Sequence, residues 1–204
     1  MRRCLALLLT AAVAPSAVAQ RTDTVRAALP ERARALVSAR EAAERGHLTR
    51  LAVWGGVSAA GGAALALASS RRRTPARWAF GVQTAGWGLV NASIAAFGLS
   101  KSPADPATLA EATHRENGYH DILLFNEGLN VAYVATGVTM VVAGSRGVRG
   151  ADAWRGHGWA VVAQGAMLLA LDGVAIAGSS SRYDALNAIS AEVRPGGAAV
   201  TVRF

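Results

Sequence analysis

Four long apolar segments dominate the sequence and restrict what the chain can fold into. They cover residues 51–68, 78–99, 122–143 and 158–178, and their only charged side chains are Glu127 and Asp172. About 20 apolar residues are enough for a helix to cross the hydrocarbon core of a bilayer, and a helix satisfies its own backbone polar groups there. The alternation typical of strands is absent. The sequence therefore predicts an all-α integral membrane four-helix bundle.

The first 19 residues have the pattern of a secretory signal peptide. Arg2 and Arg3 precede the apolar run CLALLLTAAVA, and Ala17-Val18-Ala19 supplies the small residues before a cleavage site. An uncleaved anchor helix is the alternative. The single cysteine, Cys4, lies in this segment, so a mature chain beginning at Gln20 has no disulfide, thiolate metal site or cysteine nucleophile.

The arginines predict the direction in which the spans run. The loops at residues 69–77 and 144–157 carry seven arginines, whereas the loop at 100–119 has mixed charge. Positive loops stay in the cytoplasm, so both mature termini are expected outside the bacterial cytoplasmic membrane, in the periplasm. Trp78, Trp154 and Trp159 would then lie at the inner interface. The net charge is +8, and seven of the 21 Lys and Arg residues lie in these two loops. No aromatic-basic platform accompanies them, so nucleic acid is not an expected partner.

Two segments flank the predicted domain of residues 47–178. Within residues 20–46, Pro30 and Gly46 suit the start and end of a short amphipathic helix on the outer surface, with a partner-binding helix as the alternative. Residues 179–204 form an expected periplasmic tail. Its Pro195-Gly196-Gly197 turn predicts a small hairpin of Ile189–Val193 with Ala199–Phe204.

Small residues and a weak internal repeat suggest how the spans pack. Gln83 precedes Asn91 by eight residues, as Gln164 precedes Asp172, which suggests two helical hairpins, 47–99 and 120–178, related as a parallel repeat. Small pairs four residues apart allow helix backbones to approach closely. They occur in the first span and also permit a homo-oligomer: Gly55/Ala59, Gly56/Ala60 and Gly62/Ala66.

Polar residues of three spans should fall in one layer of the outer half of the bundle. A carboxylate that faces lipid costs a few kcal/mol, so these side chains should face the interior. Protonation, a shared cation or hydrogen bonds from neighbouring amides would each accommodate the two carboxylates. The predicted cluster, a ligand-binding or proton/cation site, comprises Asn91, Asn126, Glu127, Asn130, Tyr133 and Asp172, while Gln83 and Gln164 should form a second pair nearer the inner side.

Several roles fit such a cluster. It can join helices structurally, bind a small ligand or cation, or carry protons or small cations through Glu127 and Asp172. A catalytic pair is disfavoured because no nucleophile or zinc motif accompanies it, so we expect no enzyme. At the outer mouth, His114, His120 and Asp121 are metal ligands by type, although their spacing matches no strong metal motif. No cofactor follows from the sequence.

The third span also carries a family resemblance. The stretch LLFNEGL from Leu123 to Leu129, the earlier Trp87 and Asn91, and the later Gln164-Gly165 and Asp172 resemble a bacterial family of small four-span membrane proteins of unknown function. The resemblance covers residues 47–178 and implies the four-helix architecture without an activity. Glu127 departs from it, because a smaller or neutral residue is expected there. The sequence thus predicts a non-enzymatic structural or small-ligand-binding membrane protein, with a proton or small-cation carrier as the alternative.

Overall fold

The structure, a computed structural model, describes residues 29–102 and 104–193, and these are helical apart from short connections. The all-α prediction is confirmed for this part of the chain, in which there is no strand. The N-terminal segment and the second half of the predicted hairpin lie outside the described residues. The helices are α1 (Glu31–Leu67), α2 (Pro75–Leu99), α3 (Leu109–Ser145) and α4 (Ala151–Val193).

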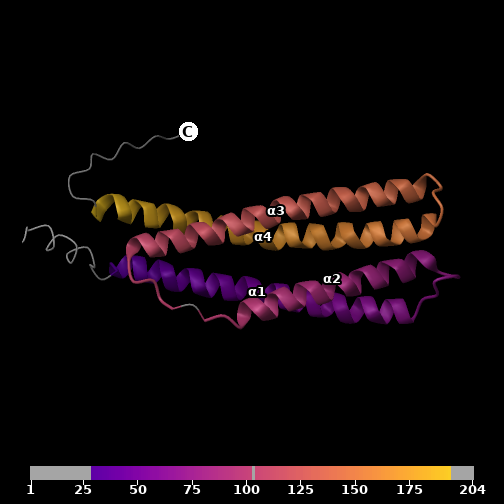
Figure 1. Cartoon of the computed structure of the whole chain (residues 1–204), viewed down its shortest axis with the longest axis horizontal. Coiled ribbons are helices and arrows are strands. Elements are labelled where there is room, and N and C mark those ends of the chain that lie inside the picture. The colour runs from indigo at the N-terminus through magenta and orange to yellow at the C-terminus, as the bar shows by residue number, and fades with distance from the viewer. Residues whose placement is uncertain (1–28, 103, 194–204) are drawn as a thin grey trace, which may run out of the picture.

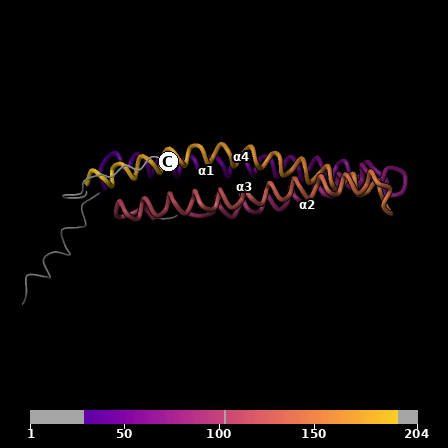
Figure 2. Tube along the Cα trace, turned by 90° about the horizontal axis from the view of Figure 1, so that it is seen from above, coloured from indigo at the N-terminus to yellow at the C-terminus, as the bar shows by residue number. Residues whose placement is uncertain are grey.

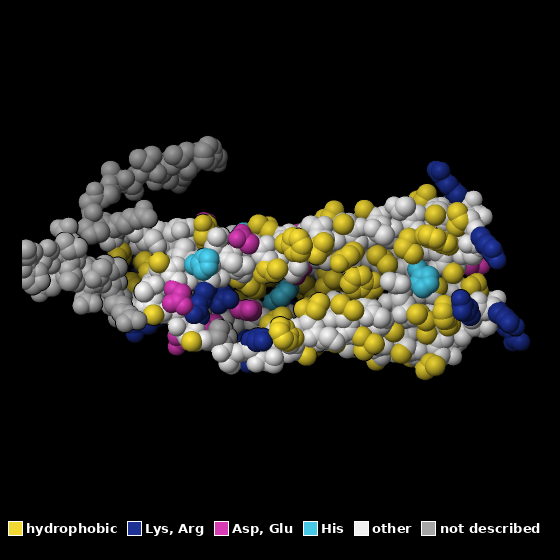
Figure 3. All heavy atoms as spheres, viewed as in Figure 1, with side chains coloured by type: hydrophobic (Ala, Val, Ile, Leu, Met, Phe, Trp, Pro, Cys, Tyr) yellow, Lys and Arg dark blue, Asp and Glu magenta, His cyan; other side chains and the backbone are white. Residues whose placement is uncertain are grey.

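The helices pack in two pairs. α1 lies along α2 and α3 along α4, and α4 joins the pairs through contacts with α2 and α1. Figures 1 and 2 show the elongated assembly, in which the α1–α2 and α3–α4 connections lie at the same end. Figure 3 shows Lys and Arg side chains gathered at that end and hydrophobic ones along the adjoining shaft. The two arginine-bearing loops therefore meet at one end of the molecule.

Three helices are longer than a bilayer requires. α1 and α3 have 37 residues and α4 has 43, which at 1.5 Å per residue is about 55–65 Å, against about 30 Å of hydrocarbon. Beyond the apolar shaft their ends pack on one another. The core there consists of Ala33, Ala112, Leu186 and Ile189.

The long helices correct two predictions about the segments that flank the spans. The helix expected to end at Gly46 starts at Glu31 after Pro30 but continues to Leu67. An internal glycine costs only about 1 kcal/mol, and α1 keeps one buried face through Ala33, His47 and Leu51. The same kind of packing carries α4 to Val193, so the strand expected at Ile189–Val193 is wrong.

The loop predicted at 100–119 is also shorter than expected, because α3 begins at Leu109. The Thr108 hydroxyl accepts a hydrogen bond from the Glu111 backbone N–H at 3.2 Å, and the Glu111 carboxylate accepts one from the Ala107 N–H at 2.9 Å. The two bonds resemble a capping box and satisfy backbone donors at the helix start, except that Glu111 binds the N–H of Ala107, the residue before the N-cap Thr108. The donors at Ala107 and Arg115 also lower the pKa of Glu111. The helix start was thus encoded by a capping box that the sequence analysis did not use.

The apolar character of the helices differs from the prediction at α2. α1, α3 and α4 are each long and apolar enough to cross a membrane, whereas α2 is not among the helices that meet this criterion. α2 contains no charge between Trp78 and Leu99, but Gln83, Thr84 and Asn91 reduce its mean hydropathy. Composition therefore supports three of the four predicted spans.

Glycines bring the backbones of α1 and α2 into direct contact. A Cβ atom added at Gly55 would lie 2.8 Å from the Gly88 carbonyl oxygen, and one at Gly62 would lie 2.7 Å from that of Gly81. These distances are too short for a side chain, so only glycine permits the approach. Of the predicted small pairs, those of Gly55 and Gly62 lie in this interface, whereas Gly56 has open space beside it.

Substitution of Gly62 by Ala should force α1 and α2 apart and lower the free energy of unfolding by about 1–3 kcal/mol. The neighbouring Gly61 has open space at its Cβ position, so Gly61→Ala should be neutral or gain up to about 1 kcal/mol of helix propensity. Unfolding of both variants in detergent micelles measures the difference. Equal stability of the two variants would contradict the interface.

Candidate functional site: a polar slot between α2 and α3

Asp172 on α4 is the centre of the polar cluster. Its side chain is buried, and its carboxylate accepts a hydrogen bond from Asn130 Nδ2 on α3 at 2.7 Å. Its other oxygen lies 3.2 Å from His47 Nε2 on α1. One carboxylate therefore joins three helices, and it satisfies the expectation that an acid in an apolar segment faces the interior.

Gln164, two turns closer to the arginine loops on α4, forms a second centre. Its Oε1 accepts hydrogen bonds from Trp54 Nε1 at 2.9 Å and from Asn91 Nδ2 at 3.4 Å. Its amide Nε2 donates to the Ser58 hydroxyl at 3.1 Å. This buried amide connects α4 to α1 and α2, and both its carbonyl oxygen and its NH₂ group form hydrogen bonds.

A cavity of about 150 Å³ lies beside these two centres. It is located where α2 and α3 separate, since in the described chain no Cα atom of α2 comes within 8 Å of one in α3. Figure 3 shows a hollow between the two helix pairs on this face. We call this cavity the slot. Its lining combines polar and apolar side chains: His47, Leu51, Trp87, Asn91, Ile94, Asn126, Leu129, Asn130, Tyr133, Leu168 and Asp172.

One aromatic pair bridges the separated helices. Trp87 of α2 and Tyr133 of α3 have ring centroids 4.9 Å apart with their planes tilted by 57°. Tilted pairs of this kind are favourable beyond the area they bury. Both residues line the slot, so the rings form part of its wall.

Five of the six predicted site residues come together in the slot, and Glu127 does not. Asn91, Asn126, Asn130, Tyr133 and Asp172 line it. Glu127 is directed instead toward α4, where its Oε1 would lie 3.9 Å from a Cβ at Gly173, and its buried Oε2 has no hydrogen-bond partner among the described residues. One residue of offset along α3 explains the difference, because consecutive side chains point about 100° apart.

The sequence analysis missed His47 as a partner of Asp172. The predicted helix end at Gly46 placed His47 in a connection, whereas the continuous α1 carries it into the bundle. The signal was present in the spacing, since His47, Leu51, Gly55, Ser58 and Gly62 recur at intervals of three or four, which is the pattern of one buried helical face.

The predicted pairing of Gln83 with Gln164 is wrong. Gln83 Oε1 lies 3.0 Å from His157 Nδ1, whereas Gln164 belongs to the centre described above. Gln164 contacts Asn91, which lies about two turns beyond Gln83 on α2, so the two glutamines occupy different levels of the bundle. The repeat in the sequence therefore does not produce matching contacts at these two positions.

Outside the apolar shaft, a separate charged contact joins α3 and α4. Glu116 is almost fully buried and accepts hydrogen bonds from Ser179 Oγ at 2.5 Å and from Arg182 Nε and Nη2, each at 3.1 Å. Next to it, Arg40 lies over the Tyr119 ring at 5.6 Å. Burial, followed by the negative charge of Glu44, raises the pKa of Tyr119 to about 12. These residues stabilise the part of the long helices that lies away from the arginine loops.

The predicted metal ligands do not form a centre in the described part of the chain. No group of three or more histidine, cysteine, aspartate or glutamate side chains there is placed to share an ion. His120 stacks on Tyr183, with ring centroids 6.5 Å apart, and His114 and Asp121 are exposed. Aromatic packing thus accounts for His120.

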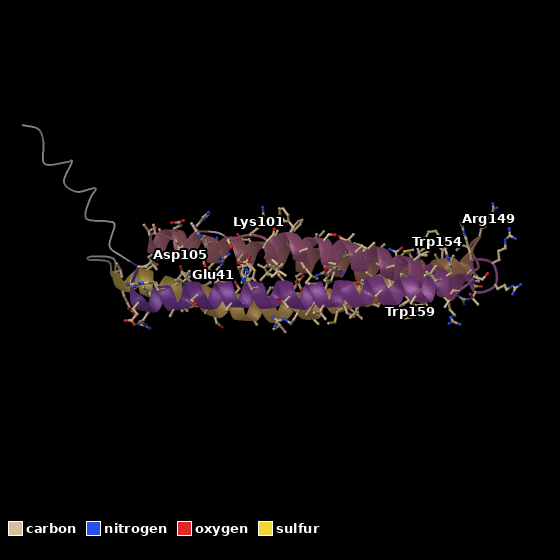
Figure 4. The ribbon with its side chains drawn as sticks, turned by 90° about the horizontal axis from the view of Figure 1, so that it is seen from below. Glu41, Lys101, Asp105, Arg149, Trp154 and Trp159 are labelled. Carbon is tan, nitrogen blue, oxygen red and sulfur yellow. The ribbon has the colours of Figure 1, made fainter. Side chains whose placement is uncertain are left out.

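A larger cleft of about 570 Å³ lies away from the arginine loops, between α1 and the α2–α3 connection. Figure 4 shows Glu41, Lys101 and Asp105 around it. Its acids are accompanied by Arg45 and Lys101, so its charges can compensate one another in contact with solvent. The smaller slot is the stronger candidate because its carboxylate is buried among apolar helices.

Replacement of Gln164 by Leu should leave Trp54 Nε1, Asn91 Nδ2 and Ser58 Oγ without this partner. We expect a loss of about 1–3 kcal/mol in unfolding free energy. Gln83→Leu is the matched control, since it removes a single half-buried contact with His157 and should cost about 1 kcal/mol or less. Denaturation in mixed micelles compares the two, and a larger loss in the control would exclude the proposed centre.

The raised pKa of Tyr119 predicts that the protein loses stability in alkali. The unfolded side chain ionises near pH 10 and the folded one at about 12. Between these values the folded state holds the extra proton, so unfolding becomes easier as pH rises. Tyr119→Phe should lessen this decline, whereas Tyr183→Phe should leave the contribution of Tyr119 in place. Unfolding free energies measured from pH 8 to 11 test this, and an unchanged slope in Tyr119→Phe would refute it.

Comparison with known proteins places the chain in a family. A family described as a family of unknown function, DUF6992, matches residues 50–173, which include all six predicted site residues and most of the apolar shaft. No curated protein and no solved structure shows a significant match. The match agrees with the expectation of an uncharacterised family. Since it covers more than half of the chain, the protein belongs to the DUF6992 family of unknown function.

Proposed function

We propose that this protein is a non-enzymatic integral membrane protein of the bacterial cytoplasmic membrane that binds a small polar ligand in the slot between α2 and α3. In this proposal four spans cross the bilayer, the arginine loops lie in the cytoplasm, and the mature termini lie outside. The ends of α1, α3 and α4 beyond the shaft form a helical head on the outer side.

The distribution of side chains supports the membrane arrangement. Three helices are apolar enough to span, and large apolar side chains are exposed along the shaft, including Phe97 at 66% and Phe125 at 62%. Figure 4 shows Trp154 and Trp159 near the end that carries Arg149, as expected for an aromatic belt beside positive loops. α2 is included because it packs along α1.

One observation carries the binding proposal: a cavity between membrane helices is lined by Asp172, His47 and three asparagines. Polar residues within spans are costly and typically mark ligand or ion sites. Asp172 bonds to α3 and α1, and a cavity still remains open beside its carboxylate. The slot combines apolar side chains with a few converging polar groups, as ligand sites do.

Native mass spectrometry of the gently extracted protein tests the proposal. We expect a bound mass in the wild type that is lost in Asp172→Asn. Asp152→Asn is the control, because Asp152 pairs with Arg155 at the surface of the inner end and should leave the adduct in place. Bare protein in every sample would favour a purely structural polar core.

Transport of protons or small cations is the second candidate. It is favoured by the contact of His47 with Asp172 inside the bundle, since imidazole and carboxylate both exchange protons. In proteoliposomes with an internal pH dye, a carrier should show flux that Asp172→Asn abolishes and Asp152→Asn preserves. Flux that is the same in all three proteins would exclude this role for Asp172.

A further inference from the structure

The charges around the slot are of one sign. α2 contributes no charged residue between Trp78 and Leu99, α3 contributes Glu127 nearby, and α4 contributes Asp172. His47 of α1 faces Asp172, and Tyr133 of α3 also lines the slot. No Lys or Arg lines the slot. A cationic partner for Asp172 would therefore be His47 or a group from outside the protein.

His47 uses one ring nitrogen on Asp172 and leaves the other without a partner. Nε2 faces the Asp172 carboxylate, while the buried Nδ1 has no partner among the described residues. No lysine or arginine reaches Asp172 in this part of the chain, so the slot holds a carboxylate whose protein partners are an amide and an imidazole.

On these observations we propose that the slot binds a small organic cation of the alkylammonium class, with Asp172 as its counter-ion. This inference rests on the proposed binding function and specifies its ligand. A carboxylate offers about four acceptor positions, and Asn130 and His47 occupy two of them. The remaining positions can accept N–H donors from an ammonium group.

The wall of the slot suits a cation with an alkyl part. The faces of Trp and Tyr attract cations within about 6 Å of the ring centre, and Trp87 and Tyr133 form such a wall. Leu51, Ile94, Leu129 and Leu168 complete the lining with apolar surface. Aromatic rings and aliphatic side chains solvate an alkylammonium group better than a bare metal ion, which would require several oxygen ligands.

The dimensions restrict the ligand further. About 150 Å³ corresponds to roughly five water molecules at about 30 Å³ each, which is enough for an amine with a few carbon atoms. Ile94 and Leu129, at 54% and 36% exposure, line the slot from the two separated helices. The ligand would therefore enter between α2 and α3 rather than along the bundle axis.

Calorimetric titration of the full chain in detergent, with n-butylammonium as the probe and n-butanol as its neutral counterpart, tests this inference. We expect saturable binding of the cation and none of the alcohol at the same concentrations. Asp172→Asn should weaken cation binding at least tenfold. Trp87→Leu should weaken it by about fivefold to thirtyfold, the range of a cation–π contact, and Trp87→Phe should retain most of the affinity.

Trp159→Leu is the control for the tryptophan change, because Trp159 is 55% exposed and does not line the slot. If Asp172→Asn fails to fold, the three tryptophan variants still decide the result. Equal binding of butanol, unchanged affinity in Trp87→Leu, or no saturable binding of either probe would overturn the inference. Bound mass found by native mass spectrometry decides the broader binding proposal separately, since a neutral adduct would sustain that proposal and refute the cation.

Discussion

The burial of one carboxylate among apolar helices is the constraint on which the rest of the structure depends. Asp172 has no lysine or arginine partner along the shaft, and an unsatisfied acid would be costly there. Its bonds to Asn130 and His47 set the relative positions of α4, α3 and α1. Gln164 does the same for α4, α1 and α2. Two polar centres on one helix thus organise the bundle around α4.

The polar bonds of α4 hold the two helix pairs together, and glycine packing draws the helices together within each pair. The slot is the space that both leave between the pairs. Gly55 and Gly62 draw α2 against α1, and Gly137 and Gly158 bring α3 equally close to α4, where an added Cβ would lie 2.7 Å from a carbonyl oxygen. Each pair is tight, so the space that remains lies between the pairs. A cavity lined by polar side chains follows from the packing of small residues within each pair.

Much of this was predictable from the sequence, and several of the errors concern where helices begin and end. The sequence correctly predicted an all-α chain with four helices over the described residues, and five of the six predicted site residues line the slot. The helix end predicted at Gly46 and the length of the loop at 100–119 were wrong because a local glycine or polar stretch matters less than a continuous buried helical face. That error also hid His47. Whether the Glu127 side chain points into the slot depends on how α3 is rotated about its axis. Tertiary packing, not composition, decides that rotation.

Accessibility of the slot is the most direct test of the account. In a Cys4→Ser background, Asn126→Cys introduces a thiol on the wall of the slot, and Val138→Cys introduces one at a site on α3 that is 48% exposed. We predict that a small cationic methanethiosulfonate reagent modifies Asn126→Cys much faster than Val138→Cys in membranes, and that butylammonium slows the reaction. Equal rates at the two positions, or no modification at residue 126, would contradict an open polar slot between α2 and α3.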